Sequence, residues 1–517
     1  MGQGRWPLRR WPQAGTVGLS AGSDGRKTRR GGNFDASRSA PRKRPLPGKA
    51  PRRDDGAGNG PRISDGADGF VPDGYSANDR PGLGARLVAT KLLSAIVDAR
   101  TSADGLLDAA GGHPGFRALE GRDQGLVKAI ILSALRFRGT ISRALDACLD
   151  RPLPPNAAAL KHILHVGATQ ILFLDVPDSA AVDLAVAAAN VDSRSRRFAG
   201  MINAVLRRLS REKDALREVA TATENMPDWL AARMVAAYGP ERTEAIARAH
   251  LTPAPLDLTV KRDPAGWAGK LGGVALPNGT VRLGSFDGPV TALEGFAEGE
   301  WWVQDAAAAL PAQLFGDLTG QRVADLCAAP GGKTAQLIAA GGVVAALDIN
   351  ANRMKRLKAN LARLSLEAET VVGDIAAFEP AEPFDAILLD APCSSTGTIR
   401  RHPDVPYTKD AEEIAKLAGV QARLLGEAVR LLAPGGRLVF SNCSLDPAEG
   451  EAIVAALLAD RSDIVRDPVQ PGELPGMEFA LTPEGDLRTT PDMMGGAADA
   501  PATGGLDGFY AARLKRI

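Results

Sequence analysis

The chain is 517 residues long, which is too long for one ordinary domain and predicts two or three. The overall charge of +1 hides an uneven distribution, because residues 1–80 carry +8, residues 81–225 carry +4 and residues 226–517 carry −11. The bulk charge therefore excludes a uniformly basic nucleic-acid binder, and only the front of the chain indicates a nucleic-acid partner.

The cysteine content and the hydropathy exclude further classes of protein. Only four cysteines occur and none form a CxxC pair, so the chain has neither a disulfide framework nor this metal-binding motif. Its first residues include arginines but lack the apolar core of a secretory signal, and no run of 18 apolar residues is present. We expect a reduced, cytoplasmic monomer with no metal and no membrane segment.

The first half of the chain divides into two predicted parts. Residues 1–82 are rich in Gly, Pro, Arg and Ser, which predicts a disordered basic segment. It is either an arm that tethers RNA or the product of a start assigned too far upstream. Residues 83–225 predict an all-helical RNA-binding domain, because apolar residues recur at helical spacing in five stretches, 86–97, 126–135, 160–173, 181–189 and 201–209.

The second half predicts a small mixed subdomain and then a regular alternation of strands and helices. Residues 226–320 contain two short helical patterns and short strand patterns such as 256–260. In residues 321–517, a doubly wound, Rossmann-like α/β domain is predicted. Its strands are expected at 322–327, 343–349, 369–372, 385–389, 437–441 and 509–514, and its helices at 333–340, 351–364, 411–432 and 449–458.

A small-residue loop at 325–334, Asp-Leu-Cys-Ala-Ala-Pro-Gly-Gly-Lys-Thr, joins the first of these strands to the first helix. A phosphate loop would need glycine where Cys327 stands, and GxGxxG is also absent. Asp348 and Asp374 follow the next two strands, where they can bind ribose hydroxyls and an adenine amino group. Each feature alone is also explained by a tight turn or a helix cap. Together they favour a nucleoside cofactor without pyrophosphate, and S-adenosylmethionine is the best candidate.

Two cysteines follow two consecutive predicted strands, Cys393 after Asp390-Ala-Pro and Cys443 after Ser441-Asn. A helix connects these strands, so they are parallel and both thiols are expected at the carboxyl edge of the sheet. One thiolate could add to carbon 6 of a cytosine, which makes carbon 5 nucleophilic, and the other could assist release. Asp390 could bind the pyrimidine near nitrogen 3. Alternatively, either cysteine is a small buried apolar residue, as we expect for Cys148.

These motifs, with 303–308, 373–374, 390–404, 442–449 and 507–513, resemble the Sun-family RNA (cytosine-5) methyltransferases, especially the bacterial small-subunit enzymes that act on 16S rRNA. Residues 176–182 and 202–208 resemble the antitermination factor NusB. The resemblance implies that Cys443 is the nucleophile and that Cys393 assists release. It also implies a set of residues that contact S-adenosylmethionine or the base: Cys327, Ala328, Ala329, Pro330, Gly331, Gly332, Lys333, Asp348, Arg353, Asp374 and Asp390.

The resemblance is incomplete at two positions and leaves rival functions. Asn442 and Gly450 stand where the family usually has threonine and asparagine, which affects loop geometry. We expect methylation of carbon 5 of a cytosine in RNA, with 16S rRNA as the first choice. The rivals are a non-catalytic NusB-like RNA-binding factor and a methyltransferase for tRNA, another RNA, small molecules or protein. A DNA cytosine methyltransferase would use Cys393 as nucleophile, so chemistry alone leaves the two cysteine roles open.

Overall fold

The computed structural model describes residues 80–154, 157–219, 221–284, 286, 288–495 and 504–517. The basic segment predicted at the front of the chain therefore lies, up to residue 79, outside the described residues. Among those described, no helix combines the length and apolar character that a bilayer crossing requires. No cluster of three or more His, Cys, Asp or Glu side chains in the same residues is arranged to hold a metal ion.

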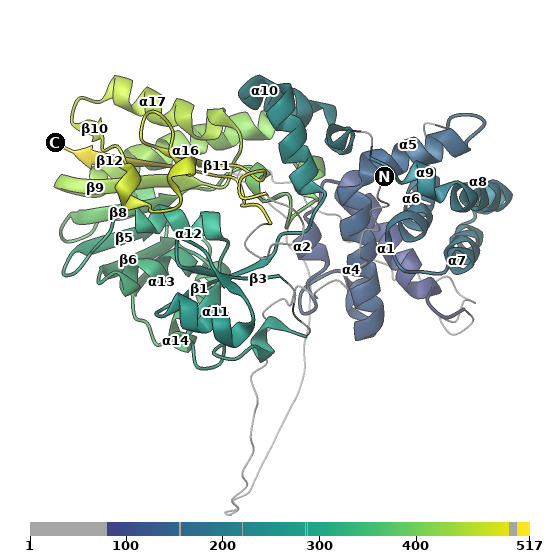
Figure 1. Cartoon of the computed structure of the whole chain (residues 1–517), viewed down its shortest axis with the longest axis horizontal. Helices are drawn as coiled ribbons and strands as arrows, with labels where there is room; N and C mark the ends of the chain where they lie inside the picture. The colour runs from purple at the N-terminus through teal and green to yellow at the C-terminus, as the bar shows by residue number, and fades with distance from the viewer. Residues whose placement is uncertain (1–79, 155–156, 220, 285, 287, 496–503) are drawn as a thin grey trace, which may run out of the picture. The chain divides into compact units, whose positions relative to one another are not determined.

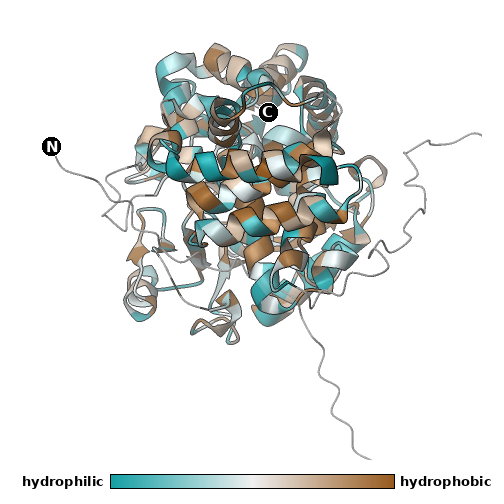
Figure 2. Ribbon diagram, turned by 90° about the vertical axis from the view of Figure 1, so that its right-hand side faces the viewer, coloured by the Kyte–Doolittle hydropathy of each residue, from teal (hydrophilic) through white to brown (hydrophobic). Residues whose placement is uncertain are grey.

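The first described region is all-helical, as predicted. Its apolar residues pack around α6, which is buried along nearly its whole length. In Figure 2 the helices turned toward the viewer carry both hydrophobic and hydrophilic residues along their length, as expected for helices with one buried side. Cys148 is buried in this core, as expected. The longer helices are α1 (Leu83–Val97), α4 (Gly121–Arg136), α5 (Arg138–Cys148), α6 (Ala158–Phe173), α7 (Asp178–Val191) and α8 (Ala199–Arg211).

A bent helix and a small sheet follow. Helix α10 (Asp228–His250) changes direction at Gly239, where φ is 76°, and Pro240 begins its second half. The two short helices expected from the sequence are therefore the two arms of α10. The small sheet is antiparallel in the order β2-β3-β1-β4. Its strands are β1 (Leu256–Val260), β2 (Val274–Ala275), β3 (Thr280–Leu283) and β4 (Trp301–Val303).

The large sheet has the order β10-β12-β9-β8-β5-β6-β7, with β11 paired to β12 (Figure 1). Its first five strands in chain order are parallel, as the alternating pattern predicted. The strands are β5 (Arg322–Leu326), β6 (Val343–Asp348), β7 (Glu369–Val372), β8 (Phe384–Asp390), β9 (Leu432–Asn442), β10 (Ile464–Arg466), β11 (Leu487–Thr489) and β12 (Phe509–Arg516).

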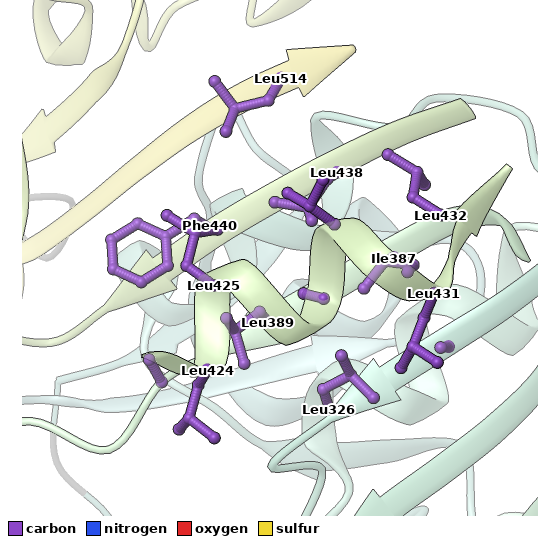
Figure 3. Packing of buried hydrophobic residues seen from close by; sticks show 14 of the residues in the cluster. Leu326, Ile387, Leu389, Leu424, Leu425, Leu431, Leu432, Leu438, Phe440 and Leu514 are labelled. Carbon is purple, nitrogen blue, oxygen red and sulfur yellow. The ribbon is translucent and has the colours of Figure 1, made fainter. Parts of the chain in front are cut away.

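Helices cover both faces of this sheet because successive strand residues alternate between them. Leu389 and Phe440 pack against α16 (Ala411–Leu431), with α17 (Glu451–Asp460) on the same face, as Figure 3 shows for Leu424 and Leu425 of α16. The opposite face packs against α12 (Ala306–Gln313) and α13 (Gly332–Ala339), beside α14 (Ala351–Arg363). The predicted doubly wound architecture is thus confirmed.

The far edge of the sheet differs from the parallel part. Strand β12 runs antiparallel to β9, and the three-residue strands β10 and β11 pair with β12. Strands of three residues are too short for alternation to be visible in the sequence, so β10 and β11 were not predicted.

The strand order also locates the site. The chain builds outward from β5 through β6 to β7, then returns to the other side of β5 to form β8 and β9. The carboxyl ends of β5 and β8 therefore border the point where the order reverses, and open α/β sheets bind their ligands at this point.

Candidate functional site

The two cysteine loops lie together at the carboxyl edge of the sheet. Strands β8 and β9 are parallel neighbours, and Asp390 lies opposite Ser441. The sulfur atoms of Cys393 and Cys443 are 3.3 Å apart, and both cysteines are free and only partly buried. The predicted meeting of the two thiols is therefore present in the structure.

The two thiols differ in acidity. The pKa of Cys443 is lowered, mainly because Cys393 donates a hydrogen bond to it, with a further contribution from Ser395 at 3.6 Å. The pKa of Cys393 is raised well above its usual range by that same hydrogen bond and by burial. The arrangement can therefore hold Cys443 as a thiolate beside a protonated Cys393, and the thiolate is the nucleophilic form of cysteine.

Asp390 is held in place from two sides. The ammonium group of Lys333 lies 2.8 Å from Oδ2 of Asp390, and the Ser441 hydroxyl donates to Oδ1 at 3.0 Å. Lys333 also lies 4.9 Å from the ring centre of Phe509. From the sequence, Lys333 was grouped with the cofactor loop, but its side chain reaches across to the edge that carries the cysteines. Lys333 therefore links the two halves of the site.

The cofactor loop follows β5 and approaches α14 closely. Cys327 has a φ of 65°, and burial raises the pKa of its thiol to about 12. Gly331 has a φ of 102°, and an added Cβ there would lie 3.0 Å from Leu357 Cγ. A side chain at Gly331 would thus be strained and crowded, which explains the glycine in this turn.

Asp348 and Asp374 end adjacent strands but differ in burial. Asp348 is 2% exposed, accepts from the backbone N–H of Ala329 at 3.2 Å and lies 3.7 Å from the guanidinium of Arg353. Asp374 is exposed, and its Oδ1 accepts from the N–H of Ala376 at 3.0 Å. Asp374 therefore caps a short helix while one carboxylate oxygen remains available. The residues predicted to contact a nucleoside cofactor therefore lie together. Asp348 and Arg353 are adjacent to the loop 327–333, and Asp374 lies at the border of this group.

Asp325, for which the sequence predicted no role, lies beneath the cofactor loop. Burial raises the pKa of this fully buried carboxyl group to about 7, although the Thr334 hydroxyl donates to it at 2.6 Å. The hydrogen bond ties the end of β5 to the start of α13. An aspartate inside an apolar strand, immediately before a glycine-rich turn, was the available signal.

Four further residues, Asp305, Arg400, Arg401 and Asp507, form an ionic cluster that we call the arginine clamp. Arg401 donates to Asp305 at 2.6 Å and to Asp507 at 2.9 Å, and Arg400 donates to Asp507 at 2.9 Å. The clamp joins the loop after Cys393 to the start of α12 and to the segment before β12. All three segments belong to motifs that the sequence indicated, but no local pattern shows which aspartate pairs with which arginine.

Comparisons with known proteins show which family the chain belongs to. The family model "16S rRNA methyltransferase RsmB/F" matches residues 313–515, and the NusB family model matches residues 84–211. The chain is 37% identical over 448 residues to ribosomal RNA small subunit methyltransferase B of Xylella fastidiosa (strain Temecula1), covering 84% of this chain and 98% of that protein. It is 35% identical over 419 residues to the protein of the same name from Vibrio cholerae, covering 77% and 95%.

A solved structure supports the fold. The crystal structure of PH0851 aligns with 84% of this chain and 99% of its own chain, with a TM-score of 0.62 and 22% sequence identity. At this identity the likeness concerns the fold alone.

Proposed function

Because this chain belongs to the 16S rRNA methyltransferase RsmB/F family, we propose that it methylates carbon 5 of a cytosine in 16S ribosomal RNA. The family and the relatives named for ribosomal RNA methylation support that reaction class, with S-adenosylmethionine as methyl donor. The choice of carbon 5 rests on one observation, the 3.3 Å approach of the Cys393 and Cys443 sulfur atoms at the reversal of strand order. Other methyl acceptors do not require such a pair.

We assign the attacking role to Cys443, whose pKa is lowered beside a Cys393 thiol whose pKa is raised. Its thiolate adds to carbon 6 of the cytosine, so that a carbon–sulfur bond forms and carbon 5 gains the electron density of an enamine. S-adenosylmethionine, when bound, supplies an electrophilic methyl group. We assign Asp390, which Lys333 and Ser441 hold in place, to the pyrimidine near nitrogen 3, where it would orient the ring. Once carbon 5 carries the methyl group, its proton must leave before the enzyme can be released.

Release is assigned to Cys393. While Cys443 is a thiolate it holds the proton of Cys393, but a Cys443 bonded to carbon 6 no longer attracts that proton. Cys393 can then lose its proton to solvent and accept the proton of carbon 5. The double bond between carbons 5 and 6 re-forms, the carbon–sulfur bond breaks and the Cys443 thiolate is restored. One cysteine therefore attacks and the other completes elimination.

The residues around the cofactor loop fit S-adenosylmethionine. Residues 327–333 are small apart from Lys333, and the turn at Gly331 packs against Leu357 of α14, so the main chain of this loop can contact a nucleoside. Asp348 is assigned to the ribose hydroxyls, Asp374 to the adenine amino group and Arg353 to the support of Asp348. These assignments place the cofactor beside β5 and β6 and leave the edge of β8 and β9 for the base.

The function is tested by incubating the enzyme with 16S rRNA or tRNA and S-adenosylmethionine carrying a labelled methyl group. We expect label in 16S rRNA at a cytosine that then resists bisulfite conversion, and no label with Cys443→Ala. Label on a ribose or another base would refute the carbon 5 assignment. Label in tRNA alone would favour the alternative RNA substrate. An enzyme that binds RNA but transfers no label would favour a non-catalytic NusB-like factor.

Asp348→Ala is expected to weaken binding of S-adenosylmethionine roughly tenfold or more, because a charge-assisted hydrogen bond contributes about 1.5–3 kcal/mol. Calorimetric titration of the cofactor measures the change. Glu369→Ala is a matched control, since Glu369 is an exposed acidic residue at the start of β7, away from the carboxyl edge. Equal affinity of Asp348→Ala and the wild type would remove Asp348 from the cofactor site.

A cluster of arginines in the helical region is assigned to RNA phosphates. Replacing four exposed members by Gln should make the salt dependence of RNA binding shallower, by about 0.7–0.9 in log–log slope for each phosphate that is no longer neutralised. An equal number of basic residues toward the amino end of the large sheet serves as control. The test set is Arg194, Arg196, Arg197 and Arg207, and the control set is Arg322, Arg437, Arg461 and Lys515. Equal slopes for both variants would contradict the assignment.

A further inference from the structure

A single buried carboxylate lies behind both cysteine loops. Glu449 is 0% exposed and accepts hydrogen bonds from Ser394 and Ser444, the residues that directly follow Cys393 and Cys443. The backbone N–H of Ser394 donates to Oε1 at 2.9 Å, and the hydroxyls of Ser394 and Ser444 both donate to Oε2, the latter at 2.6 Å. Each of the two serines that donate to Glu449 is therefore next in sequence to a reactive cysteine.

Glu449 is also linked by hydrogen bonds to the residues that precede Cys393 and Cys443. Gln421 of α16 donates one hydrogen bond to Oε1 of Glu449 at 3.0 Å and another to the carbonyl of Pro392 at 2.9 Å. On the other side, Asn442 donates to the main-chain oxygen of Glu449, and its side-chain oxygen accepts from the N–H of Ser444 at 2.9 Å. Glu449 and its hydrogen-bond partners therefore hold the residues on both sides of each cysteine.

The chemistry of this centre sets it apart from a surface ion pair. Four neutral donors surround the carboxylate, and burial raises the pKa of Glu449. A buried carboxylate is costly to desolvate, and its donors would be left unsatisfied if an apolar residue replaced it. A buried carboxylate is best explained by a geometry that it fixes. Three of its donors belong to Ser394 and Ser444, and the fourth, Gln421, also contacts Pro392, so the geometry that it fixes is the position of the two cysteine loops.

We propose that Glu449 is a positioning residue that sets the spacing of the Cys393 and Cys443 sulfur atoms. This inference rests on the proposed function, in which one sulfur attacks and the other completes elimination on the same base. Glu449 does not face the base itself, and it acts through Ser394 and Ser444. Its loss should therefore disturb the cooperation of the two thiols and spare cofactor binding, because the cofactor loop follows β5 and has no part in this network.

The spacing can be tested without RNA, in the full-length enzyme. The azo oxidant diamide takes the two thiol hydrogens of Cys393 and Cys443 and is itself reduced to the hydrazine, while a disulfide forms between the sulfurs. Glu449→Gln presents an NH₂ group where one of the two acceptor oxygens was, so the hydrogen bonds that this oxygen accepted must be lost or reversed. We expect disulfide closure to slow about tenfold or more in this variant, since a displacement of about 1 Å alters rates strongly.

Glu244→Gln is the matched control. Glu244 also accepts from backbone N–H groups and a hydroxyl, those of Ala222 and Thr223, but it contacts neither cysteine loop. The control should close its disulfide at the wild-type rate. Glu449→Asp keeps both oxygens on a shorter arm and should restore part of the rate, whereas a purely space-filling role would not favour Asp over Gln.

With 16S rRNA, Glu449→Gln should lower turnover by about tenfold or more and lengthen the lifetime of the protein–RNA adduct, with unchanged affinity for S-adenosylmethionine. If Glu449→Gln does not fold, Ser394→Ala and Ser444→Ala each remove one donor and should each slow disulfide closure. Closure and turnover at wild-type rates in the folded variants would overturn the proposal. Absence of an adduct with Cys393→Ala would instead refute the cytosine mechanism, and the RNA-free closure rates would still decide the role of Glu449.

Discussion

Cys393→Ala is expected to attack RNA and complete methyl transfer, then stall as a protein–RNA adduct that survives denaturing electrophoresis. The remaining Cys443 can still form the carbon–sulfur bond, but the group assigned to elimination is gone. Cys443→Ala is expected to form no adduct and to show no turnover, because the thiol assigned to attack carbon 6 is gone. Both variants lose turnover, and only the adduct distinguishes them.

Gel electrophoresis of each variant after incubation with labelled 16S rRNA and S-adenosylmethionine measures the adduct. Cys148→Ala is the control, because Cys148 is buried in the helical core and should leave adduct chemistry unchanged. An adduct with Cys443→Ala and none with Cys393→Ala would reverse the two roles, as in the DNA cytosine enzymes. Activity retained in both variants, without an adduct in either, would exclude a covalent mechanism.

Asp305→Ala is expected to destabilise the protein by about 3–5 kcal/mol, the usual cost of removing one partner from a buried ion pair. Arg401 loses its 2.6 Å partner, and the buried Arg400 is left to share Asp507 with it. Asp305 is also the N-cap of α12, so the hydrogen bond that its side chain accepts from the N–H of Ala307 is lost as well. Because the arginine clamp holds the loop that follows Cys393, turnover should also fall.

Urea unfolding measures this effect. Asp317→Ala is the control, since Asp317 is an exposed aspartate that accepts from the backbone and hydroxyl of Thr319 and forms no part of the clamp. It should change the free energy of unfolding far less. An equal effect of the two substitutions would show that the clamp contributes no more than an exposed turn.

The clamp also predicts the acid behaviour of the protein. Burial alone would raise the pKa of Asp305, but Arg401 and Arg400 outweigh it and lower this pKa from 3.8 to about 2. A carboxyl group with a depressed folded-state pKa stabilises the fold above its unfolded pKa, and this contribution is lost as the pH falls through the folded value. Between about pH 4 and pH 2, wild type should therefore lose more unfolding free energy than Asp305→Ala.

The sequence alone determined the architecture and the meeting of the cysteines. Helical and strand periodicities are local properties, so the all-helical region and the five parallel strands could be placed within a few residues. A helix between two strands makes them parallel, and parallel neighbours end at one edge, which brought Cys393 and Cys443 together before any coordinates. The small residues at 327–333 and the strand-end Asp348 indicated the cofactor side by the same reasoning.

Only the tertiary structure decided how side chains from distant segments pair. Glu449 lies 55 residues from Ser394, and Asp305 lies 96 residues from Arg401. Contacts between residues so far apart cannot be recognised from the periodicity of the sequence. The same holds for Lys333, which reaches Asp390 instead of remaining with its loop, and for β12, which pairs antiparallel with the distant strand β9. Periodicity reports which face of an element is buried, whereas hydrogen bonds and ion pairs depend on which elements become neighbours.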